Sequence, residues 1–209
     1  MPLARRLLLA TTNRDKVHEI ADVLAGIPYE LVTLEHRPHL EPPPETARTF
    51  IENARDKARY YAAATGELTV AEDSGLEIDA LDGAPGVESA RFGGPTASYP
   101  QKFALIYEAL RVKAFDSAQA SASIETAARF VCALALVINE RVLFETTAFV
   151  EGRISPVPRG SGGFGYDPIF FYPRFGRTLA EVSAEEKAHV SHRGQAFRAL
   201  RQFLEHLRN

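Results

Sequence analysis

The sequence predicts an α/β protein, because strand-like and helix-like segments alternate along its 209 residues. The apolar run Leu7–Thr11 is followed at once by a helical pattern, which is the beginning of a strand–turn–helix unit. Two long strand-like runs, Arg129–Ile138 and Val142–Val150, flank a short turn and extend the sheet beyond one compact lobe. With no internal repeat and no clear linker, residues 1–209 are expected to form a single domain with two lobes.

The composition is that of an ordinary globular protein, with 45% hydrophobic and 24% charged residues. A net charge of −3 disfavours general nucleic-acid binding, which usually requires a basic domain. The first apolar run is too short for a signal peptide, and the longest one, Val131–Ile138, is far below the roughly 20 residues that span a bilayer. We therefore expect a cytoplasmic protein that binds neither nucleic acid nor membranes. A small anionic ligand stays possible, because it needs only a local cluster of cations.

The chain has a single cysteine, Cys132. It can form no internal disulfide and no multi-cysteine metal site. Because it lies within the apolar run Phe130–Ile138, it is expected to be a small buried side chain rather than a nucleophile.

The segment Thr11–Lys16 connects the first predicted strand to the first predicted helix. Apolar residues recur at helical spacing from Val17 to Leu24, and Asn13 or Thr12 is the natural N-cap. The start of a helix presents unpaired N–H groups and partial positive charge, which suits a phosphate. Simple capping beside a solvated lysine is an equally open interpretation of this segment.

A second strand is predicted over Tyr29–Leu34, and a second helix follows it. Thr49 and Glu52 have the spacing of a capping box at the start of that helix, which is expected to end near Gly66. Lys57 lies on this helix, where by itself it would be an ordinary surface charge.

Three carboxylates stand where predicted loops and strands end. Glu45 follows a proline-rich loop, His36–Pro44, and Asp73 follows the predicted strand Leu68–Glu72. Ligand groups of open α/β sheets gather just outside strand ends, so this place favours function. Glu72 and Asp73 face opposite directions unless Gly75 lets the strand bend. One or two of these carboxylates, together with substrate phosphates, would suit Mg²⁺, whereas ordinary solvation is expected if they stand alone.

Glycine-rich turns occupy residues 76–95, and Phe103–Ala114 is predicted to be helical. The Ser/Ala-rich segment 116–128 is expected to be a connection or a frayed helix end, with no chemistry of its own. The last helix is predicted to run from about Gly194 to Leu207.

The segment Gly160–Tyr172 mixes glycines, aromatic rings and a carboxylate. Gly160–Gly165 fits the pattern G-x-G-x-x-G, but the prolines before it and Pro168 after it disfavour the strand–turn–helix context of a dinucleotide site. Phe164, flanked by glycines, is a candidate platform on which a base could stack, whereas Ile169–Phe171 is expected to be core.

His189 and His192 are spaced like a pair of metal ligands, but no third ligand is evident nearby in the sequence. His192 and Arg193 can instead donate hydrogen bonds to carbonyl oxygens on the edge of a base. A keto purine would satisfy these donors where an amino group would not.

Six short motifs occur in the order found in one known family. They are Thr11–Lys16, Thr49–Ala54, Ala71–Leu76, Gly83–Gly86 with Ser89–Phe92, Gly162–Pro168 and Ser191–Gly194. Each motif is short, but the ordered set is specific. From residue 7 to about residue 205 the chain resembles the inosine triphosphate pyrophosphatase family.

The resemblance implies an α/β fold with a long mixed central sheet and flanking helices that form two lobes around a nucleotide-binding cleft. It also implies a homodimer and a Mg²⁺-dependent reaction. That reaction hydrolyses ITP, dITP or XTP to the monophosphate and pyrophosphate, which removes deaminated purines from the nucleotide pool.

Site residues follow from the same resemblance, motif by motif. Asp73 is expected to be the catalytic carboxylate, and Glu45 and Asp73 are expected to hold the metal, with Glu72 as an alternative ligand. Phosphate contacts are expected from Thr11, Thr12, Asn13, Arg14, Asp15, Lys16 and Lys57. The other nucleotide contacts are expected from Ser74, Phe164, Gly165, Tyr166, Asp167, Lys187, His192 and Arg193, the last two of which read the base.

The chain departs from the family pattern at three places. Thr12 stands where many members have glycine, Pro42–Pro44 stiffens the segment before Glu45 and makes that ligand less secure than Asp73, and segment 116–128 matches no part of the pattern. Two other hypotheses stay open. A Maf-type nucleotide pyrophosphatase would carry a Ser-Pro-Arg-Arg-like turn after the first strand, where this chain has Thr-Asn-Arg-Asp-Lys. A non-catalytic nucleotide sensor would use the same pocket, although the intact Asp73 and Lys16 disfavour it.

Overall fold

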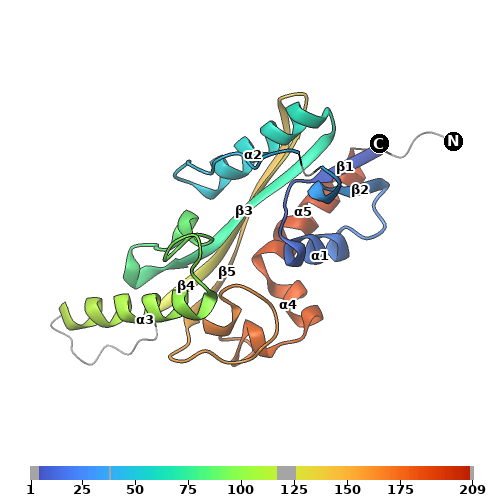
Figure 1. Cartoon of the computed structure of the whole chain (residues 1–209). Coiled ribbons are helices and arrows are strands. Elements are labelled where there is room, and N and C mark those ends of the chain that lie inside the picture. Colours follow the sequence, from blue (N-terminus) through green and yellow to red (C-terminus); the bar gives the residue numbers. More distant parts are fainter. Residues whose placement is uncertain (1–4, 38, 117–125, 208–209) are drawn as a thin grey trace. The chain divides into compact units, whose positions relative to one another are not determined.

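The structure is a computed structural model that describes residues 5–37, 39–116 and 126–207 (Figure 1). In this part of the chain seven strands form one mixed sheet, in the order β2-β1-β3-β4-β5-β6-β7. The strands are β1 (Arg5–Leu9), β2 (Tyr29–Thr33), β3 (Leu68–Ile78), β4 (Ala127–Ile138), β5 (Arg141–Ile154), β6 (Phe170–Tyr172) and β7 (Arg177–Thr178). The α-helices are α1 (Arg14–Val23), α2 (Phe50–Thr65), α3 (Tyr99–Asp116), α4 (Ala184–Val190) and α5 (His192–His206). The α/β class and the mixed sheet are as predicted.

The described residues divide into two compact units. The first unit takes its residues from 1–74, 132–148 and 192–209, and the second from 75–131 and 149–191. Each unit has its own buried apolar clusters.

In the first unit, β1 lies parallel to both of its neighbours, β2 and β3. Successive side chains of a strand point to opposite faces, so Leu7 packs in one apolar cluster and Leu8 in another. The cluster around Leu7 includes residues of α1 and α5, two helices that contact each other. The cluster around Leu8 includes Ala58 and Tyr61 of α2. Helices therefore cover both faces of this part of the sheet, which explains why Leu7, Leu8 and Leu9 of β1 are three consecutive buried apolar residues.

The local signals that define the helices and the hairpin of this unit are those found in the sequence. The side chain of Asn13 accepts a hydrogen bond from the N–H of Lys16 and so caps α1. Gly66 ends α2 in the left-handed conformation, with φ of 68°. Asn139 and Glu140 join β4 to β5 through two positive φ angles, which is the geometry of a tight hairpin.

In the second unit, α3 buries Phe103 and Ile106 in one cluster with Phe130 and Phe170. β6 pairs antiparallel with β5, and Ile154 is opposite Phe170 in that register. A Cβ at position 152 would meet the Phe170 ring at 2.6 Å, so only glycine fits there.

Several predicted boundaries are wrong. β3 does not stop at Glu72: it continues to Ile78 because Leu76 and Ile78 are buried apolar residues that extend the strand. Asp73 therefore lies within the strand and not at its end. Gly75 does not mark a bend either, since it has no positive φ, and its missing side chain leaves room for Ser89 and the carbonyl of Gly86.

The helix predicted from Phe103 begins at Tyr99, and the last helix begins at His192. Most of the predicted connection 116–128 falls outside the described residues.

Candidate functional site

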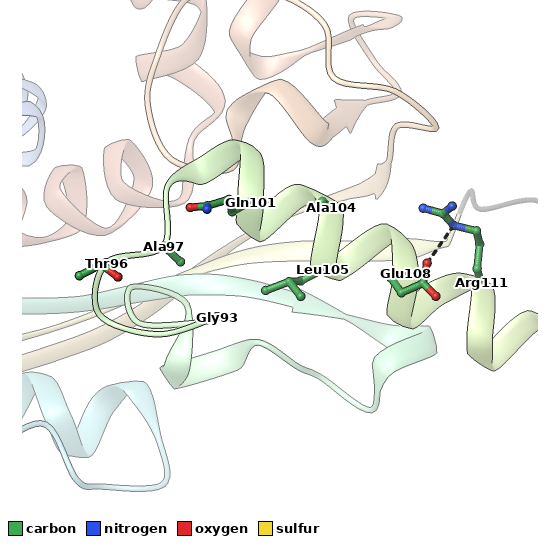
Figure 2. A pocket seen from close by; sticks show the side chains of 8 residues that line it. All are labelled: Gly93, Thr96, Ala97, Gln101, Ala104, Leu105, Glu108 and Arg111. Carbon is green, nitrogen blue, oxygen red and sulfur yellow. Dashed lines mark ion pairs between the residues drawn. The ribbon is translucent and has the colours of Figure 1, made fainter.

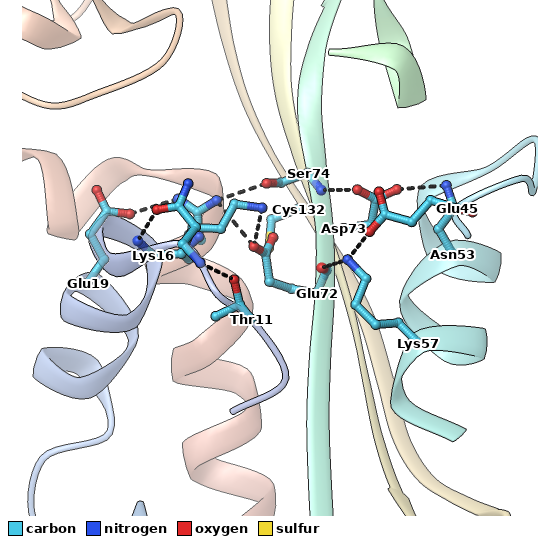
Figure 3. A network of polar contacts seen from close by, with 12 residues as sticks. Thr11, Lys16, Glu19, Glu45, Asn53, Lys57, Glu72, Asp73, Ser74 and Cys132 are labelled. Atoms are coloured by element: carbon cyan, nitrogen blue, oxygen red, sulfur yellow. Dashed lines mark hydrogen bonds and ion pairs between the residues drawn. The ribbon is translucent and has the colours of Figure 1, made fainter. Parts of the chain in front are cut away.

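Two neighbouring carboxylates of β3, Glu72 and Asp73, are the centre of a network of polar contacts in the first unit (Figure 3). Both are buried, with 2% and 6% of their surface exposed. Because β3 is extended at this point, the two side chains leave the strand in opposite directions. Glu72 meets cations carried by α1 and α5, and Asp73 meets α2.

Glu72 lies between two cations. Its Oε1 is 2.6 Å from Nζ of Lys16 and 3.6 Å from Nη2 of Arg193. Arg193 also contacts Glu19, with 2.8 Å between Nη1 and Oε2. Burial alone would raise the pKa of Glu72, but Lys16 and then Arg193 hold that pKa well below its ordinary value. Glu72 is therefore an anion that fixes two cations in place.

Cys132 contacts the same carboxylate from β4, the strand next to β3 in the sheet. Its Sγ is 3.5 Å from Oε2 of Glu72, and the residue is fully buried. Burial, followed by the charge of Glu72, raises the pKa of the thiol well above its ordinary value. The thiol is therefore protonated and donates to Glu72. The predicted burial of this cysteine is confirmed, but its polar partner was not predicted.

Asp73 accepts two hydrogen bonds, and each of its carboxylate oxygens takes one. Nδ2 of Asn53 donates to Oδ2 at 2.9 Å, and the N–H of Ser74 donates to Oδ1 at 2.9 Å. Burial raises the pKa of Asp73 to about 6. The hydrogen bond from Asn53 and the charge of Lys57 oppose that rise, while Glu45 and Glu72 add to it. The charges of these carboxylates act on one another.

Lys57 connects the Glu45 segment to β3. Its Nζ contacts the carboxylate of Glu45 and donates to the backbone carbonyl of Glu72 at 3.2 Å. Burial lowers the pKa of Lys57, but Glu45, with smaller contributions from Glu72 and Asp73, raises it overall. Only 15% of the side chain is exposed, so Lys57 is not the ordinary surface charge that the helix alone would suggest.

The segment Thr11–Lys16 forms the N-terminal end of α1, as predicted. The N–H of Asn13 donates to Oγ1 of Thr11 at 3.2 Å, and Oδ1 of Asn13 accepts from the N–H of Lys16 at 3.1 Å. Thr12, Arg14 and Asp15 are exposed. The ammonium of Lys16 thus reaches Glu72 from a helix start whose backbone N–H groups are partly uncapped.

The second unit contains the other set of predicted residues. Asp167 is buried, and its Oδ2 accepts from the N–H of Phe164 at 2.8 Å and from Nζ of Lys187 at 2.6 Å. Lys187 is also buried, and its Nζ lies 4.5 Å from the centre of the Phe164 ring. Gly163 has φ of 64°, and a Cβ there would collide with the carboxylate of Asp167. These contacts fix the backbone that carries the Phe164 ring.

Tyr166 holds this segment from its other end. Its hydroxyl donates to the carbonyl of Ser89 at 2.9 Å, and its ring packs edge-on against Tyr99 with centroids 5.4 Å apart. Gly165 is followed by a short 3-10 turn, Asp167–Ile169, and not by an α-helix. The segment therefore lacks the helix that a dinucleotide motif requires.

His192 and Arg193 begin α5 and are buried, with 5% and 2% of their surface exposed. Besides its contacts with Glu19 and Glu72, Arg193 donates from Nη2 to Oγ of Ser74 at 2.8 Å. The guanidinium is therefore directed into the network around Glu72. That these two residues read a base stays a prediction.

A separate pocket of about 630 Å³ lies in the second unit, beside α3 (Figure 2). It is lined by Gly93, Thr96, Ala97, Gln101, Ala104, Leu105, Glu108 and Arg111. It contains none of the predicted site residues. The predicted site residues described above lie instead in the networks around Glu72, Asp73 and Asp167, and their roles stay a prediction.

Three members of the Glu72 and Asp73 network were not predicted as site residues: Asn53, Glu19 and Cys132. Asn53 lies within the quoted motif Thr49–Ala54, which is the signal that could have found it. Glu19 and Cys132 carry no such signal, because they reach Glu72 and Arg193 only through the tertiary fold.

Across the ranges 5–37, 39–116 and 126–207, no three His, Cys, Asp or Glu residues are grouped so that they could hold a metal ion by themselves. Over the same ranges no helix is both long enough and apolar enough to cross a bilayer.

Comparison with known proteins identifies the family of this chain. The model of the Ham1 family matches residues 7–203. The dITP/XTP pyrophosphatase of an Exiguobacterium species is 44% identical over 195 residues, covering 93% of this chain and 94% of the relative. That of Geobacter sulfurreducens is 42% identical over 199 residues, covering 95% and 96%.

Solved structures give the same result. A HAM1 protein from Coxiella burnetii superposes with a TM-score of 0.86 at 36% identity, covering 97% of this chain and 99% of the other. A nucleoside-triphosphatase, or dITP/XTP pyrophosphatase, from Mycobacterium abscessus gives a TM-score of 0.71 at 40% identity, covering 93% and 98%. The chain belongs to the Ham1 family.

Proposed function

We propose that this protein hydrolyses deaminated purine nucleoside triphosphates, namely ITP, dITP and XTP, to the monophosphate and pyrophosphate. The observation that carries the proposal is the 40–44% identity, over nearly the whole chain, to relatives named dITP/XTP pyrophosphatase. The buried cations and carboxylates of the first unit support it, because phosphoryl transfer depends mainly on positioning and on neutralising charge.

Lys16 and Lys57 are proposed to bind the phosphates, together with the N-terminal end of α1 over Thr11–Lys16. Both ammonium groups are held by carboxylates, Lys16 by Glu72 and Lys57 by Glu45. A lysine whose position is fixed in advance needs little reorganisation when an anion arrives. The pyrophosphate that leaves carries the charge that these two lysines offset.

Mg²⁺ is proposed to bind at Glu45 and Asp73. The donor chemistry suits this ion: Glu45 and Asp73 are both carboxylates, and Glu45 is near enough to raise the pKa of Asp73. Magnesium usually takes one or two carboxylates and completes its shell with water and substrate phosphates. When bound, the ion supplies positive charge to phosphate oxygens and lowers the pKa of coordinated water.

Glu72 suits the metal less well than Glu45 and Asp73 do. Its side chain is 1% exposed, its Oε1 faces Lys16 and Arg193, and its Oε2 accepts from Cys132. A metal at Glu72 would have to compete with two cations and a thiol, whereas at Glu45 it would compete with the ammonium of Lys57 alone among the contacts described. The role we assign to Glu72 is to hold Lys16 and Arg193.

Asp73 is proposed to activate the attacking water by accepting its proton. Asn53 and the N–H of Ser74 each hold one of its oxygens, which fixes the plane of the carboxylate. Each carboxylate oxygen has a further lone pair for a water molecule or a metal.

The residues of the second unit are proposed to bind the nucleotide through Phe164. The buried pair of Asp167 and Lys187 fixes the backbone below that ring, and Gly165 and Tyr166 continue the same segment. Stacking is tolerant of base identity, so selectivity for a keto purine is assigned to His192 and Arg193, with Ser74 beside them. The protein is further proposed to be cytoplasmic and to form a homodimer. Sedimentation at several protein concentrations would test the dimer.

The test is pyrophosphate release, with Mg²⁺, from ITP and XTP compared with ATP and GTP. Strong turnover of ITP and XTP alone is the expected result. Equal turnover of all four substrates would leave a hydrolase but would remove the role given to His192 and Arg193. No release from any of them would favour a nucleotide sensor.

A further inference from the structure

Asn53 connects the Asp73 carboxylate to the segment that carries Glu45, and these two acids are proposed to hold the metal. Its Nδ2 donates to Oδ2 of Asp73 at 2.9 Å, and its Oδ1 accepts from the N–H of Ala47 at 3.0 Å. Ala47 follows Glu45 by two residues. The amide is 2% exposed, so both contacts are shielded from water.

Lys57 makes a second connection between the same two segments. It lies one helical turn after Asn53, on the same face of α2. Its Nζ contacts the carboxylate of Glu45 and the backbone carbonyl of Glu72. The Glu45–Ala47 segment is thus tied to residues 72–73 of β3 by two side chains of one helix.

The chemistry of the connection requires an asparagine. A carboxylate needs a donor, and a backbone N–H needs an acceptor. Asn53 supplies both from one planar amide. If the amide were flipped, its oxygen would face the Asp73 carboxylate and its NH₂ group would face the N–H of Ala47, so neither hydrogen bond could form. Aspartate keeps only the acceptor, and alanine keeps neither.

We propose that Asn53 is a positioning residue that sets the separation and orientation of the Glu45 and Asp73 carboxylates. This inference rests on the proposed function. Without the amide, Asp73 keeps the N–H of Ser74 on Oδ1, but Oδ2 loses its donor. The N–H of Ala47 loses its acceptor at the same time, so the Glu45 segment keeps only its connection through Lys57. Loss of a partner outside the ligand shell typically lowers metal affinity or activity about 10- to 100-fold.

The experiment compares Asn53→Ala with Thr49→Ala. Thr49 caps the same helix: its Oγ1 accepts from the N–H of Glu52 and donates to Oε2 of Glu52, so these side-chain hydrogen bonds involve neither Asp73 nor Ala47. Four quantities are measured for each variant. They are kcat for ITP, the Mg²⁺ concentration that gives the half-maximal rate, Mg²⁺ binding by calorimetry, and binding of a non-hydrolysable ITP analogue without metal.

For Asn53→Ala we expect kcat to fall and the Mg²⁺ requirement to rise by about tenfold or more. Metal-free binding of the analogue should stay within about twofold. Thr49→Ala should lower the melting temperature and leave kcat and the Mg²⁺ requirement unchanged. Loss of function in proportion to loss of stability in both variants would reduce Asn53 to a structural residue.

Asn53→Asp serves as the second variant if alanine prevents folding. It retains the acceptor for Ala47 but replaces the donor to Asp73. If Asn53→Asp behaves like the wild type, Asn53 is not a positioning residue for Asp73. If the unaltered protein releases no pyrophosphate, the proposed function fails, and calorimetric Mg²⁺ binding still judges Asn53 by itself.

Discussion

Glu72 and Asp73 are consecutive residues of β3 whose carboxylates meet entirely different partners. Oε1 of Glu72 lies 2.6 Å from the ammonium of Lys16, whereas Oδ2 of Asp73 accepts from the amide of Asn53 at 2.9 Å. Burial raises the pKa of Asp73 to about 6, whereas the cations around Glu72 keep its pKa low. The alternation of a pleated strand thus gives two adjacent acids two different tasks.

Replacing Asp73 by Asn should abolish most turnover and preserve binding. An amide cannot accept the proton of the attacking water and is a weaker magnesium ligand, so kcat is expected to fall about 10²- to 10⁴-fold. Loss of one hydrogen-bond acceptor lowers the free energy of unfolding, whereas removal of a buried charge raises it. The two effects oppose each other, so the variant should fold. Steady-state pyrophosphate release and calorimetry with an ITP analogue measure the two effects. Turnover close to that of the wild type would exclude Asp73 as the catalytic carboxylate.

Replacing Glu72 by Gln should instead destabilise the fold. The change leaves Lys16 and Arg193 without their shared anion, and breaking a buried ion pair from one side costs about 3 kcal/mol. The matched control is Glu35→Gln, which breaks an exposed pair with Arg14 and should cost less than about 1 kcal/mol. Urea unfolding measures both. Equal losses in the two variants would show that the Glu72 network does not stabilise the protein.

The sequence predicted the elements that carry local signals and missed those that depend on tertiary contacts. The cap at Asn13 and the left-handed end at Gly66 were predictable because short polar side chains and glycine act locally. The continuation of β3 through Asp73 was not, since three polar residues and a glycine interrupt its apolar pattern. The candidate site was assembled from motif order, and the contacts of Asn53 and Cys132 emerge only when α2 and β4 pack beside β3.

Replacing Phe164 by Ala should weaken substrate binding with little change in kcat. Stacking of one base on an aromatic ring contributes about 1–3 kcal/mol, so KM for ITP is expected to rise about tenfold. Phe149, which is 47% exposed on β5, provides the control, and Phe149→Ala should leave KM within about twofold. Steady-state kinetics with ITP distinguish the two. An unchanged KM in the Phe164 variant would remove this ring from the nucleotide site.

Cys132 should matter for substrate binding although it lies outside any expected contact with substrate. Its thiol donates to Oε2 of Glu72 at 3.5 Å, and Oε1 of the same carboxylate holds Lys16. Cys132→Ala removes the donor, which should lower stability by about 1–2 kcal/mol. Because Glu72 then holds Lys16 less firmly, KM for ITP should rise severalfold more than kcat falls. Cys132→Ser keeps a hydroxyl donor of similar size and should restore both quantities, as measured by urea unfolding and steady-state kinetics. If serine proves no better than alanine, the thiol contributes packing alone and the hydrogen bond to Glu72 has no role in holding Lys16.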